Sequence, residues 1–141
     1  MARRDAIKLL GGVPIFEGLT PKELRAIETS SKEVTHRAGS TLAKEGDSGA
    51  GFFLILDGDV AIKVGDRKVR TLTAGDFFGE ISLLDGGPRT ATVAAETEVT
   101  TLGLTQWTFK RLIEQNPSIA SKMLKFMAQR LRSATVAQHT D

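Results

Sequence analysis

Two side chains of opposite charge, Glu80 and Arg89, lie nine positions apart in a stretch whose pattern suits anion binding. The stretch, residues 78–93, reads FGEISLLDGGPRTATV. Its short apolar turn of helix, Ile81 to Leu84, would present unpaired N–H groups and positive potential at its N-terminus. Arg89 adds a planar cation that can bind two phosphate oxygens at once, and an ionised Glu80 accepts hydrogen bonds from hydroxyl groups. Phosphate combined with hydroxyl describes a sugar phosphate or a nucleotide.

The glycine next to Glu80 differs in role from the other turn glycines. A side chain at Gly79 would separate a ligand from the backbone, so we expect a ligand to approach this residue closely. Gly39, Gly46, Gly58 and Gly75 lie beside polar turn residues and predict turns that need a positive φ. These four glycines indicate the fold and not the ligand.

The composition is that of an ordinary globular protein and argues against several kinds of enzyme. The 141 residues suit one domain, and 40% of them are apolar and 26% charged. Cysteine is absent, so no disulfide framework or thiolate nucleophile is available. His36 and His139 lie far apart without ligand-like spacing. We therefore expect no metal site and no zinc enzyme.

The sequence predicts a cytoplasmic protein without a membrane segment. No run approaches about 18 apolar residues, and the N-terminus lacks a signal-peptide pattern. The net charge is only +2, but six Lys or Arg and two acidic residues follow from Thr105 onward. This excess fits either a solvated helix face or a docking surface for an acidic partner or nucleic acid. We do not expect nucleic acid, because no second basic helix pair is present to form a DNA-reading unit.

The first segment of the single predicted domain, residues 1–30, is a helical lead-in. A short helix over 5–10 ends at a glycine pair. The next helix has strong start signals, with Thr20 as cap, a proline at the first position and Glu23 to complete a capping box.

Residues 31–104 have the pattern of a β-barrel that contains the 78–93 stretch. About eight short strands are separated by turns every eight to twelve residues, as in sandwiches and jelly rolls. A nearly continuous apolar run over 52–56 predicts a strand buried on both faces, and Asp57–Gly58 predicts a hairpin. The expected fold class is mainly β with flanking helices: an eight-stranded jelly-roll β-barrel, or double-stranded β-helix, with N-terminal helices and a long C-terminal helix.

Residues 105–138 predict two further helices. Thr105 caps the first, and Asn116 with Pro117 starts the second, which runs to about Gln138. The second helix would span about 30 Å, more than a small barrel needs, so its far end could cover a ligand or form one side of a dimer. Its apolar stripe consists of Ile119, Met123, Phe126, Met127, Leu131 and Ala134.

The 78–93 stretch resembles the phosphate-binding cassette of the cyclic nucleotide-binding domain family, and we call it the cassette. This family includes the catabolite activator proteins, the regulatory subunits of protein kinase A and the cyclic-nucleotide-gated channels. Ser82 departs from the alanine that is frequent in the family, although a small residue is kept. The resemblance extends from Leu10 to Arg132. The matching cassette residues are Phe78-Gly79-Glu80-Ile81, Leu83-Leu84 and Pro88-Arg89-Thr90-Ala91-Thr92.

The resemblance implies a cyclic nucleotide as ligand and assigns its contacts. Glu80 would bind the ribose 2′-hydroxyl and Arg89 the equatorial phosphate oxygens. Backbone N–H groups near Gly79, Glu80 and Ala91 would complete the phosphate cradle, and the Thr90 hydroxyl would also reach the phosphate. The full set of implied binding residues is Phe78, Gly79, Glu80, Ile81, Ser82, Arg89, Thr90, Ala91, Ile62, Leu72 and Thr135.

The resemblance favours cAMP and leaves cGMP open. In the family, a threonine directly after the arginine, the position of Thr90, can also hydrogen-bond the guanine amino group. Dimeric bacterial relatives hold adenine N6 with hydroxyl residues of the long helix, a part that Thr135 or Ser133 could take. Ile62 and Leu72 would line the apolar face of the sugar and base, or would belong simply to the barrel core.

The resemblance implies a cyclic nucleotide sensor that has no cofactor and no enzymatic activity. Ligand would draw the cassette helix inward, and the C-terminal helix would move and signal to an effector protein or to a second copy of the chain. The alternative is a ligand-free protein-interaction or dimerisation module of the same fold. Family members that lose binding usually lose the glutamate or the arginine, and this chain has both. We expect no winged-helix DNA reader after the barrel, unless the chain is a fragment of a longer protein.

Overall fold

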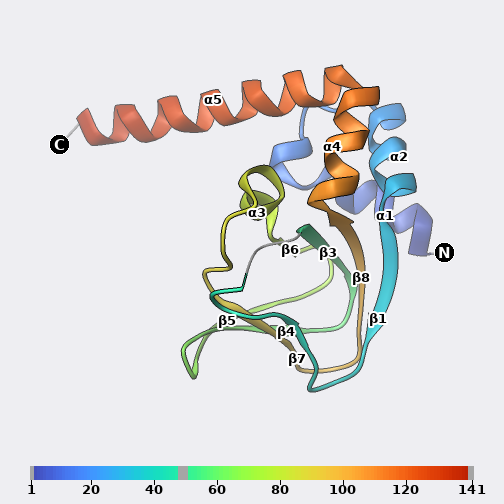
Figure 1. Cartoon of the computed structure of the whole chain (residues 1–141), viewed down its shortest axis with the longest axis vertical. Helices are drawn as coiled ribbons and strands as arrows, with labels where there is room; N and C mark the ends of the chain where they lie inside the picture. Colours follow the sequence, from blue (N-terminus) through green and yellow to red (C-terminus); the bar gives the residue numbers. More distant parts are fainter. Residues whose placement is uncertain (1, 48–50, 140–141) are drawn as a thin grey trace.

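The computed structural model describes residues 2–47 and 51–139, in which helices, strands and helices follow one another (Figure 1). The first helices are α1 (Ala2–Gly11), the 3-10 helix η1 (Pro14–Phe16) and α2 (Pro21–Ser30). The strands are β1 (Lys32–His36), β2 (Thr41–Ala43), β3 (Gly51–Asp57), β4 (Val60–Val64), β5 (Arg67–Leu72), β6 (Phe77–Phe78), β7 (Thr92–Ala95) and β8 (Val99–Thr105). The remaining helices are α3 (Glu80–Asp85), α4 (Gln106–Gln115) and α5 (Pro117–His139).

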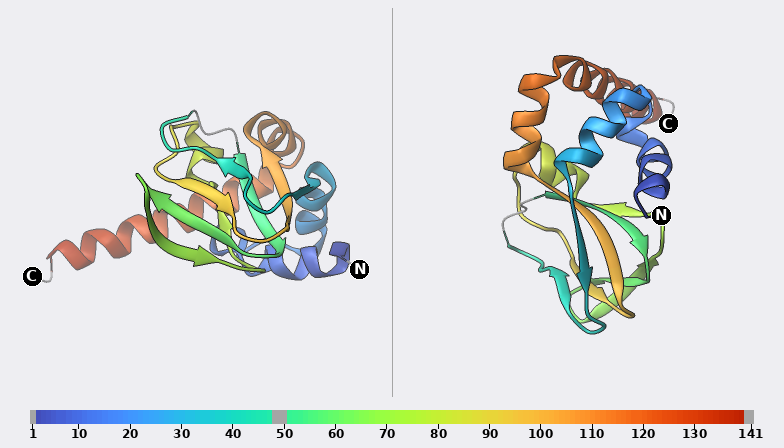
Figure 2. Two further views of the ribbon diagram at one scale, coloured as in Figure 1. Left: turned by 90° about the horizontal axis from the view of Figure 1, so that it is seen from below. Right: turned by 90° about the vertical axis from the view of Figure 1, so that its right-hand side faces the viewer.

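The strands of the described residues form two four-stranded antiparallel sheets, which confirms the expected mainly-β jelly-roll fold. Their orders are β1-β8-β3-β6 and β2-β7-β4-β5, and the sheets lie below the helices in the right-hand view of Figure 2. The hairpin predicted at Asp57–Gly58 is wrong, because β3 and β4 belong to different sheets. The turn itself exists, with φ of 96° at Gly58, but the chain uses it to cross from one sheet to the other.

The core is divided into two clusters. One cluster joins α1, α2, α4 and the start of α5 to β3 and β8, with Phe16, Phe52 and Leu102 fully buried in it. The other fills the space between the two sheets and includes Ile55 and Val93. The helices thus close one end of the β-sandwich, as Figure 2 shows, and the apolar sequence pattern explains which face of each strand is buried.

Two of the predicted helix starts have the expected side-chain caps. Thr20 and Glu23 form the capping box at α2, with the Glu23 N–H donating to Thr20 Oγ1 at 3.2 Å and the Thr20 N–H donating to Glu23 Oε1 at 2.8 Å. Thr105 Oγ1 accepts from the Thr108 N–H at 3.1 Å and starts α4. The Asn116 amide instead donates to Leu112 O at 3.0 Å and so contributes to the end of α4, while α5 begins at Pro117 as predicted.

The helix α5 packs on the body of the protein only near its start. Ile119 and Met123 are buried and Phe126 is half-buried, whereas Leu124 and Leu131 are each 70% exposed. In Figure 1 the helix starts beside α4, crosses above α3 and continues away from the sheets. The apolar stripe therefore does extend past the barrel edge, as the sequence predicts.

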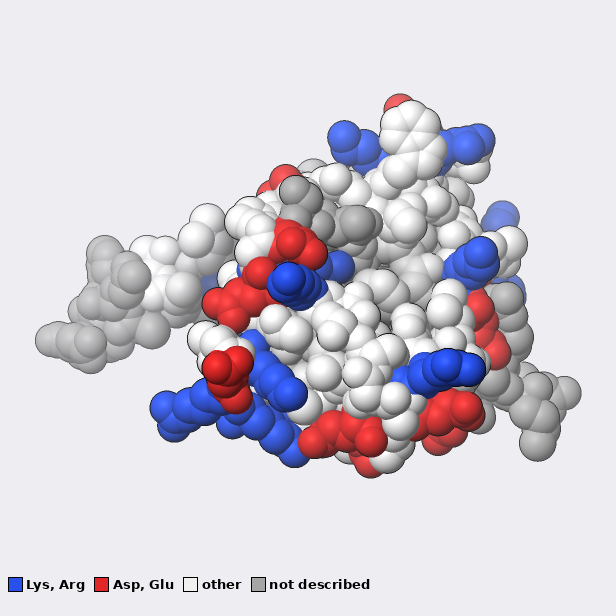
Figure 3. Space-filling view, turned by 60° about the horizontal axis from the view of Figure 1, so that its bottom comes forward, with Lys and Arg blue, Asp and Glu red and all other residues white. Residues whose placement is uncertain are grey.

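The charged surface shows no extensive region of one sign on the face drawn in Figure 3. Lys and Arg side chains lie beside Asp and Glu around a largely uncharged centre. The mixed charges of this face do not produce the one-signed field that a nucleic-acid interface uses. Over residues 2–47 and 51–139, no helix combines the length and the apolar character needed to cross a membrane.

Candidate functional site

A pocket of about 580 Å³ lies between the cassette and the β4–β5 strands. This volume is within the range of about 300–1,000 Å³ that small-molecule sites usually have. Carbon-rich side chains and a small number of charged groups share its wall, which is also typical of such sites. The lining residues are Ile62, Arg70, Leu72, Asp76, Phe77, Phe78, Gly79, Glu80, Ile81, Ser82, Asp85, Gly87, Pro88, Arg89, Thr90, Ala91 and Val93.

The short helix α3 holds the cassette by its buried face. Leu83 is 1% exposed and belongs to the helical core cluster, and Ser82 is buried beside it. Gly79 and Gly86 flank the helix with φ of 86° and 68°, a left-handed conformation that glycine adopts without steric cost. The first helical bond runs from the Leu83 N–H to Gly79 O at 2.9 Å, so the N–H groups ahead of it lack a helical acceptor and can bind an anion.

Close packing, as well as the φ angle, requires a glycine at position 79. A Cβ atom at this position would lie 2.3 Å from Gly51 O and 2.5 Å from an Arg89 Nη atom. Any side chain would therefore push apart the backbone of β3 and the arginine of the cassette. The close approach that the structure shows at Gly79 is that of Gly51 O and Arg89, and close approach of a ligand stays a prediction.

Arg89 is half-buried, and contacts with other protein atoms orient its side chain. Its Nη2 donates to Gly51 O at 2.8 Å, and the guanidinium lies 6.0 Å from the centroid of the Phe78 ring. Its backbone N–H donates to Asp47 O at 2.8 Å. Burial lowers the pKa of Arg89 from its ordinary value, yet a guanidinium remains charged at neutral pH. The pocket thus contains a positioned cation with donors left over for a ligand, since one arginine carries five N–H donors.

Glu80 lies in the first turn of α3 and lines the pocket together with Arg89. It is half-buried, and no described residue donates a hydrogen bond to its carboxylate or forms an ion pair with it. A carboxylate that lines a pocket without a protein donor is available to hydroxyl groups of a ligand. The two residues that the sequence picks out therefore converge on one cavity.

Three apolar side chains lie in the wall of the pocket opposite the cassette. Leu72 and Val93 are buried, and Ile62 is half-buried. Phe78 stacks on Phe53 with ring centroids 5.1 Å apart, which fixes the aromatic ring beneath Arg89. This wall suits a sugar and an aromatic base, whose flat faces are also apolar.

Ten of the eleven predicted binding residues line this one pocket, and Thr135 does not. Thr135 is exposed on the far part of α5, and its hydroxyl donates to Leu131 O at 2.9 Å. Its contact with a base stays a prediction that would require α5 to move. Ser133 is also exposed on this part of the helix.

Arg70 is the main pocket residue that the sequence reasoning missed. It is paired with Ile62 across the β4–β5 ladder and lies two positions before Leu72, so all three are on the same face of the sheet. That period of two was the signal that could have found it. Asp76 and Asp85 were missed as well, but each already accepts a backbone N–H, from Thr73 at 2.9 Å and Gly87 at 2.7 Å respectively.

A second, smaller cavity of about 300 Å³ separates α3 from α5. Glu80 and Ile81 line both cavities, so α3 is the wall between them. The outer side of α3 is apolar and open, with Ile81 65% exposed. The lining residues of the second cavity are Pro14, Ile15, Phe77, Glu80, Ile81, Leu84, Phe126, Met127 and Arg130.

The part of the chain that the structure describes contains no cluster of His, Asp or Glu able to hold a metal ion. The charged side chains that line the pocket are Arg70, Asp76, Glu80, Asp85 and Arg89. Among them, Arg89 is oriented by protein contacts and Glu80 lies at the N-terminus of α3. On a β-sandwich closed by helices, this arrangement has the chemistry to accommodate a small phosphorylated and hydroxylated molecule.

Comparison with known proteins specifies the family. Residues 33–116 match the family model described as the cyclic nucleotide-binding domain. The chain therefore belongs to the cyclic nucleotide-binding domain family, as the cassette predicts, and domains of this family are regulatory.

Two curated relatives illustrate how the chain compares with longer proteins. A cAMP-dependent protein kinase regulatory subunit from Colletotrichum orbiculare is 37% identical over 113 residues, which cover 79% of this chain and 29% of the relative. A CRP-like cAMP-activated global transcriptional regulator from Mycobacterium tuberculosis is 31% identical over 130 residues, covering 89% of this chain and 58% of that protein. The chain thus spans less than two thirds of either relative.

A solved structure matches the fold over most of its length. The crystal structure of the N-terminal domain of a transcriptional regulator from Streptomyces coelicolor superposes with a TM-score of 0.86 and 31% sequence identity. The match covers 92% of this chain and 96% of the other. The fold of this chain is thus a known architecture.

Proposed function

We propose that this chain binds a cyclic nucleotide, with cAMP as the first candidate, and acts as a sensor without catalytic activity. The observation that carries the proposal is the convergence of Glu80 and Arg89 on one pocket at the N-terminus of α3. The names of the relatives support cAMP, since both the kinase subunit and the transcriptional regulator are described by it.

The proposed pose follows from the polarity of the pocket. The phosphate lies against the N–H groups of α3 and the guanidinium of Arg89, where an oriented cation and a helix N-terminus act on the same charge. The ribose 2′-hydroxyl donates to Glu80. The sugar and base then cover the apolar wall that contains Ile62 and Leu72. Thr90, which is exposed at the rim, supplies one further hydroxyl.

Arg70 favours cGMP as the second candidate. Guanine presents two acceptors, N7 and O6, on the edge where adenine presents one acceptor and one donor. Arg70 lines the pocket, and none of its N–H donors has a hydrogen-bond acceptor among the described residues. A free guanidinium fits two acceptors better than an acceptor and a donor, so Arg70 and Thr90 together would select guanine.

The proposed signal is a movement of α5. Ligand that draws α3 inward changes the wall shared by the two cavities, and Phe126, Met127 and Arg130 of α5 lie across the second cavity from it. A ligand that binds one arrangement better shifts the population towards it. The exposed far part of α5 then binds an effector protein or a second copy of the chain. A cytoplasmic location remains our prediction.

Calorimetric titration of cAMP and cGMP into wild type, Arg89→Ala and Arg67→Ala tests the function. Loss of one partner from a buried charge pair costs about 2–5 kcal/mol, and each 1.4 kcal/mol is about tenfold in affinity. Arg89→Ala should therefore weaken binding by roughly 30- to several-thousand-fold. Arg67→Ala removes the same charge from an exposed position on β5 outside the pocket and should leave binding unchanged.

The same titration distinguishes the nucleotide sensor from the alternative, a ligand-free interaction module. The absence of heat with either nucleotide in wild type would favour a ligand-free interaction module, and the search would turn to protein partners of α5. Hydrogen exchange over residues 117–138 checks the signal separately: the movement proposal fails if exchange in this range does not depend on the nucleotide.

A further inference from the structure

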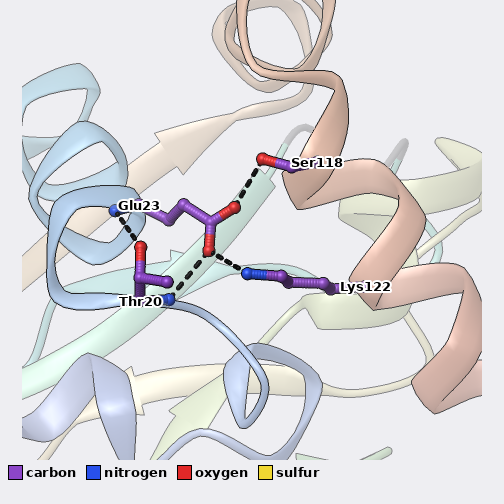
Figure 4. Close-up of polar contacts among 4 residues, drawn as sticks. All are labelled: Thr20, Glu23, Ser118 and Lys122. Carbon is purple, nitrogen blue, oxygen red and sulfur yellow. Dashed lines mark hydrogen bonds and ion pairs between the residues drawn. The ribbon is translucent and has the colours of Figure 1, made fainter.

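Glu23 joins the start of α5 to the start of α2, as Figure 4 shows. Its Oε1 accepts from Lys122 Nζ at 2.6 Å and from the Thr20 N–H at 2.8 Å. Its Oε2 accepts from Ser118 Oγ at 2.5 Å. The capping-box glutamate of one helix is thus also the acceptor for two side chains of another helix, 95 and 99 residues further along the chain.

This carboxylate is buried and nevertheless well stabilised. Glu23 is only 7% exposed, and burial alone would raise its pKa. The hydrogen bonds from Lys122, Ser118 and Thr20 and the charge of Lys122 outweigh the burial and lower the pKa of Glu23 to about 2. The carboxylate also lies in the first turn of α2 and beside the first turn of α5, where helix dipoles favour a negative charge.

The contacts of Glu23 divide α5 into two parts. Ser118 and Lys122 are one turn apart on the same face of the helix. The residues that directly follow them, Ile119 and Met123, are buried. From Met127 to Val136, every side chain is exposed. The first part of the helix is therefore held by charge, hydrogen bonds and core packing, while the second part meets the protein mainly across the cavity that it shares with α3.

We propose that Glu23 is the positioning residue of α5: it fixes residues 118–122 against α2, so that the helix moves with the cassette only beyond Met123. This proposal rests on the proposed function, because the movement is the one that accompanies nucleotide binding. When residues 118–122 are held in place, the rest of α5 moves about this fixed segment. The position of the segment then determines where Phe126, Met127 and Arg130 lie relative to α3. Without the anchor, the whole helix would swing from its junction with α4, and its position over the cassette would spread.

Distance measurements between two spin labels test the anchor in the full chain. Because the chain has no cysteine, labels can be attached at Glu33→Cys on β1 and Gln129→Cys on α5, both exposed positions. Pulsed double electron–electron resonance then gives the distance distribution with no nucleotide, with cAMP and with cGMP. The variant is Lys122→Met, which removes the cation and keeps most of the apolar stem. The control is Lys125→Met, an exposed lysine on the next turn of the same helix.

We expect a narrow distribution that shifts on nucleotide binding in the labelled wild type and in Lys125→Met. Lys122→Met should give a broad distribution without nucleotide. Its nucleotide Kd should rise by about tenfold, the equivalent of about 1.4 kcal/mol, since the competent position of α5 is then less populated. An unchanged distribution and Kd in Lys122→Met would overturn the proposal. A merely structural bond would lower the stability and leave the nucleotide-induced shift of the distance as in wild type.

A second variant and the measurement without nucleotide separate a failure of the anchor from a failure of the proposed function. If Lys122→Met does not fold, as judged by circular dichroism, Ser118→Ala replaces it and must broaden the distribution in the same way. If the wild type binds neither nucleotide, the proposed function fails, whereas the ligand-free distributions still decide whether Glu23 positions α5.

Discussion

Glu23 and Glu80 each lie in the first turn of a helix, in α2 and α3 respectively, and their surroundings are opposite. Glu23 is buried, and both of its carboxylate oxygens accept hydrogen bonds from the protein. Glu80 is half-buried between two cavities and has no donor among the described residues. The same residue type at the same kind of position is therefore a structural anchor where its oxygens are satisfied, and a candidate ligand contact where they are open.

Gly79, which directly precedes Glu80, is part of the same pocket. Of the substitutions considered, Gly79→Ala should have the largest effect on the pocket. The alanine must adopt a left-handed φ, which costs about 1–2 kcal/mol, and its Cβ would collide with Gly51 O and Arg89. We expect nucleotide binding to be weakened as much as by Arg89→Ala in calorimetry. Gly39→Ala is the matched control, because Gly39 has φ of 87° but no atom within 4 Å of the added Cβ. Equal binding by the two variants would refute the close-packed cradle.

Glu23→Gln should abolish a specific sensitivity to acid. Because the pKa of Glu23 is lowered from 4.5 to about 2, the ionised carboxylate stabilises the native state above pH 4.5, and this contribution is lost as the pH falls towards 2. A shift of this size corresponds to at most about 3 kcal/mol. Urea unfolding at pH 7, 4 and 3 should show a steeper loss of unfolding free energy in wild type than in Glu23→Gln. Parallel pH curves would show that the anchor is not ionic, and Glu17→Gln, at an exposed site, serves as control.

Glu80→Gln should show the reverse behaviour, with weaker binding and unchanged stability. A hydrogen bond to a charged acceptor contributes about 1.5–3 kcal/mol, so affinity should fall by roughly ten- to a hundredfold. The unfolding free energy should stay within about 0.5 kcal/mol of wild type, as for most surface substitutions. Titration with cAMP and with its 2′-deoxy analogue measures the same hydroxyl from the ligand side. If wild type binds both nucleotides equally well, Glu80 does not contact the 2′-hydroxyl.

Arg70→Ala should have the smallest effect and should change preference more than affinity. Arg70 is a second pocket charge without a described partner, so the comparison predicts a ligand role for it too. A bidentate contact to guanine discriminates by about 1–3 kcal/mol, and the lower value suits this exposed strand. We expect the ratio of cGMP to cAMP affinity to fall by roughly fivefold in competition titrations. Arg67→Ala, on the same strand, should leave the ratio unchanged, and an equal change in both variants would mean that only general charge matters.

The residues predicted for the cassette line one pocket because they are neighbours in the chain. Gly79, Glu80, Arg89 and Ala91 fall within one short helix and one turn, so local pattern and pocket coincide. Arg70 was missed because it comes from another strand, although the alternation from Leu72 placed it on the same face. The Asp57–Gly58 turn was recognised from its residues, but no local signal states which sheet the next strand joins.

The anchor at Glu23 shows a different limit of prediction. The capping box is a local pattern and was predicted, whereas Ser118 and Lys122 lie 95 and 99 residues away. A polar contact over that separation depends on how the helices pack at the end of the sandwich. The exposed far part of α5 was predicted from its length, since a helix longer than the barrel must leave it.

The place of β5 at the end of the β2-β7-β4-β5 sheet has a consequence for solubility. An edge strand offers unpaired N–H and C=O groups to which another chain can add a strand. Here the edge carries Arg67, Lys68 and Arg70, and all three side chains are exposed. Two copies that met edge to edge would bring these cations together, so the strand resists fibre-like growth. Arg70, which we propose discriminates guanine from adenine, therefore also helps to keep the chain from aggregating.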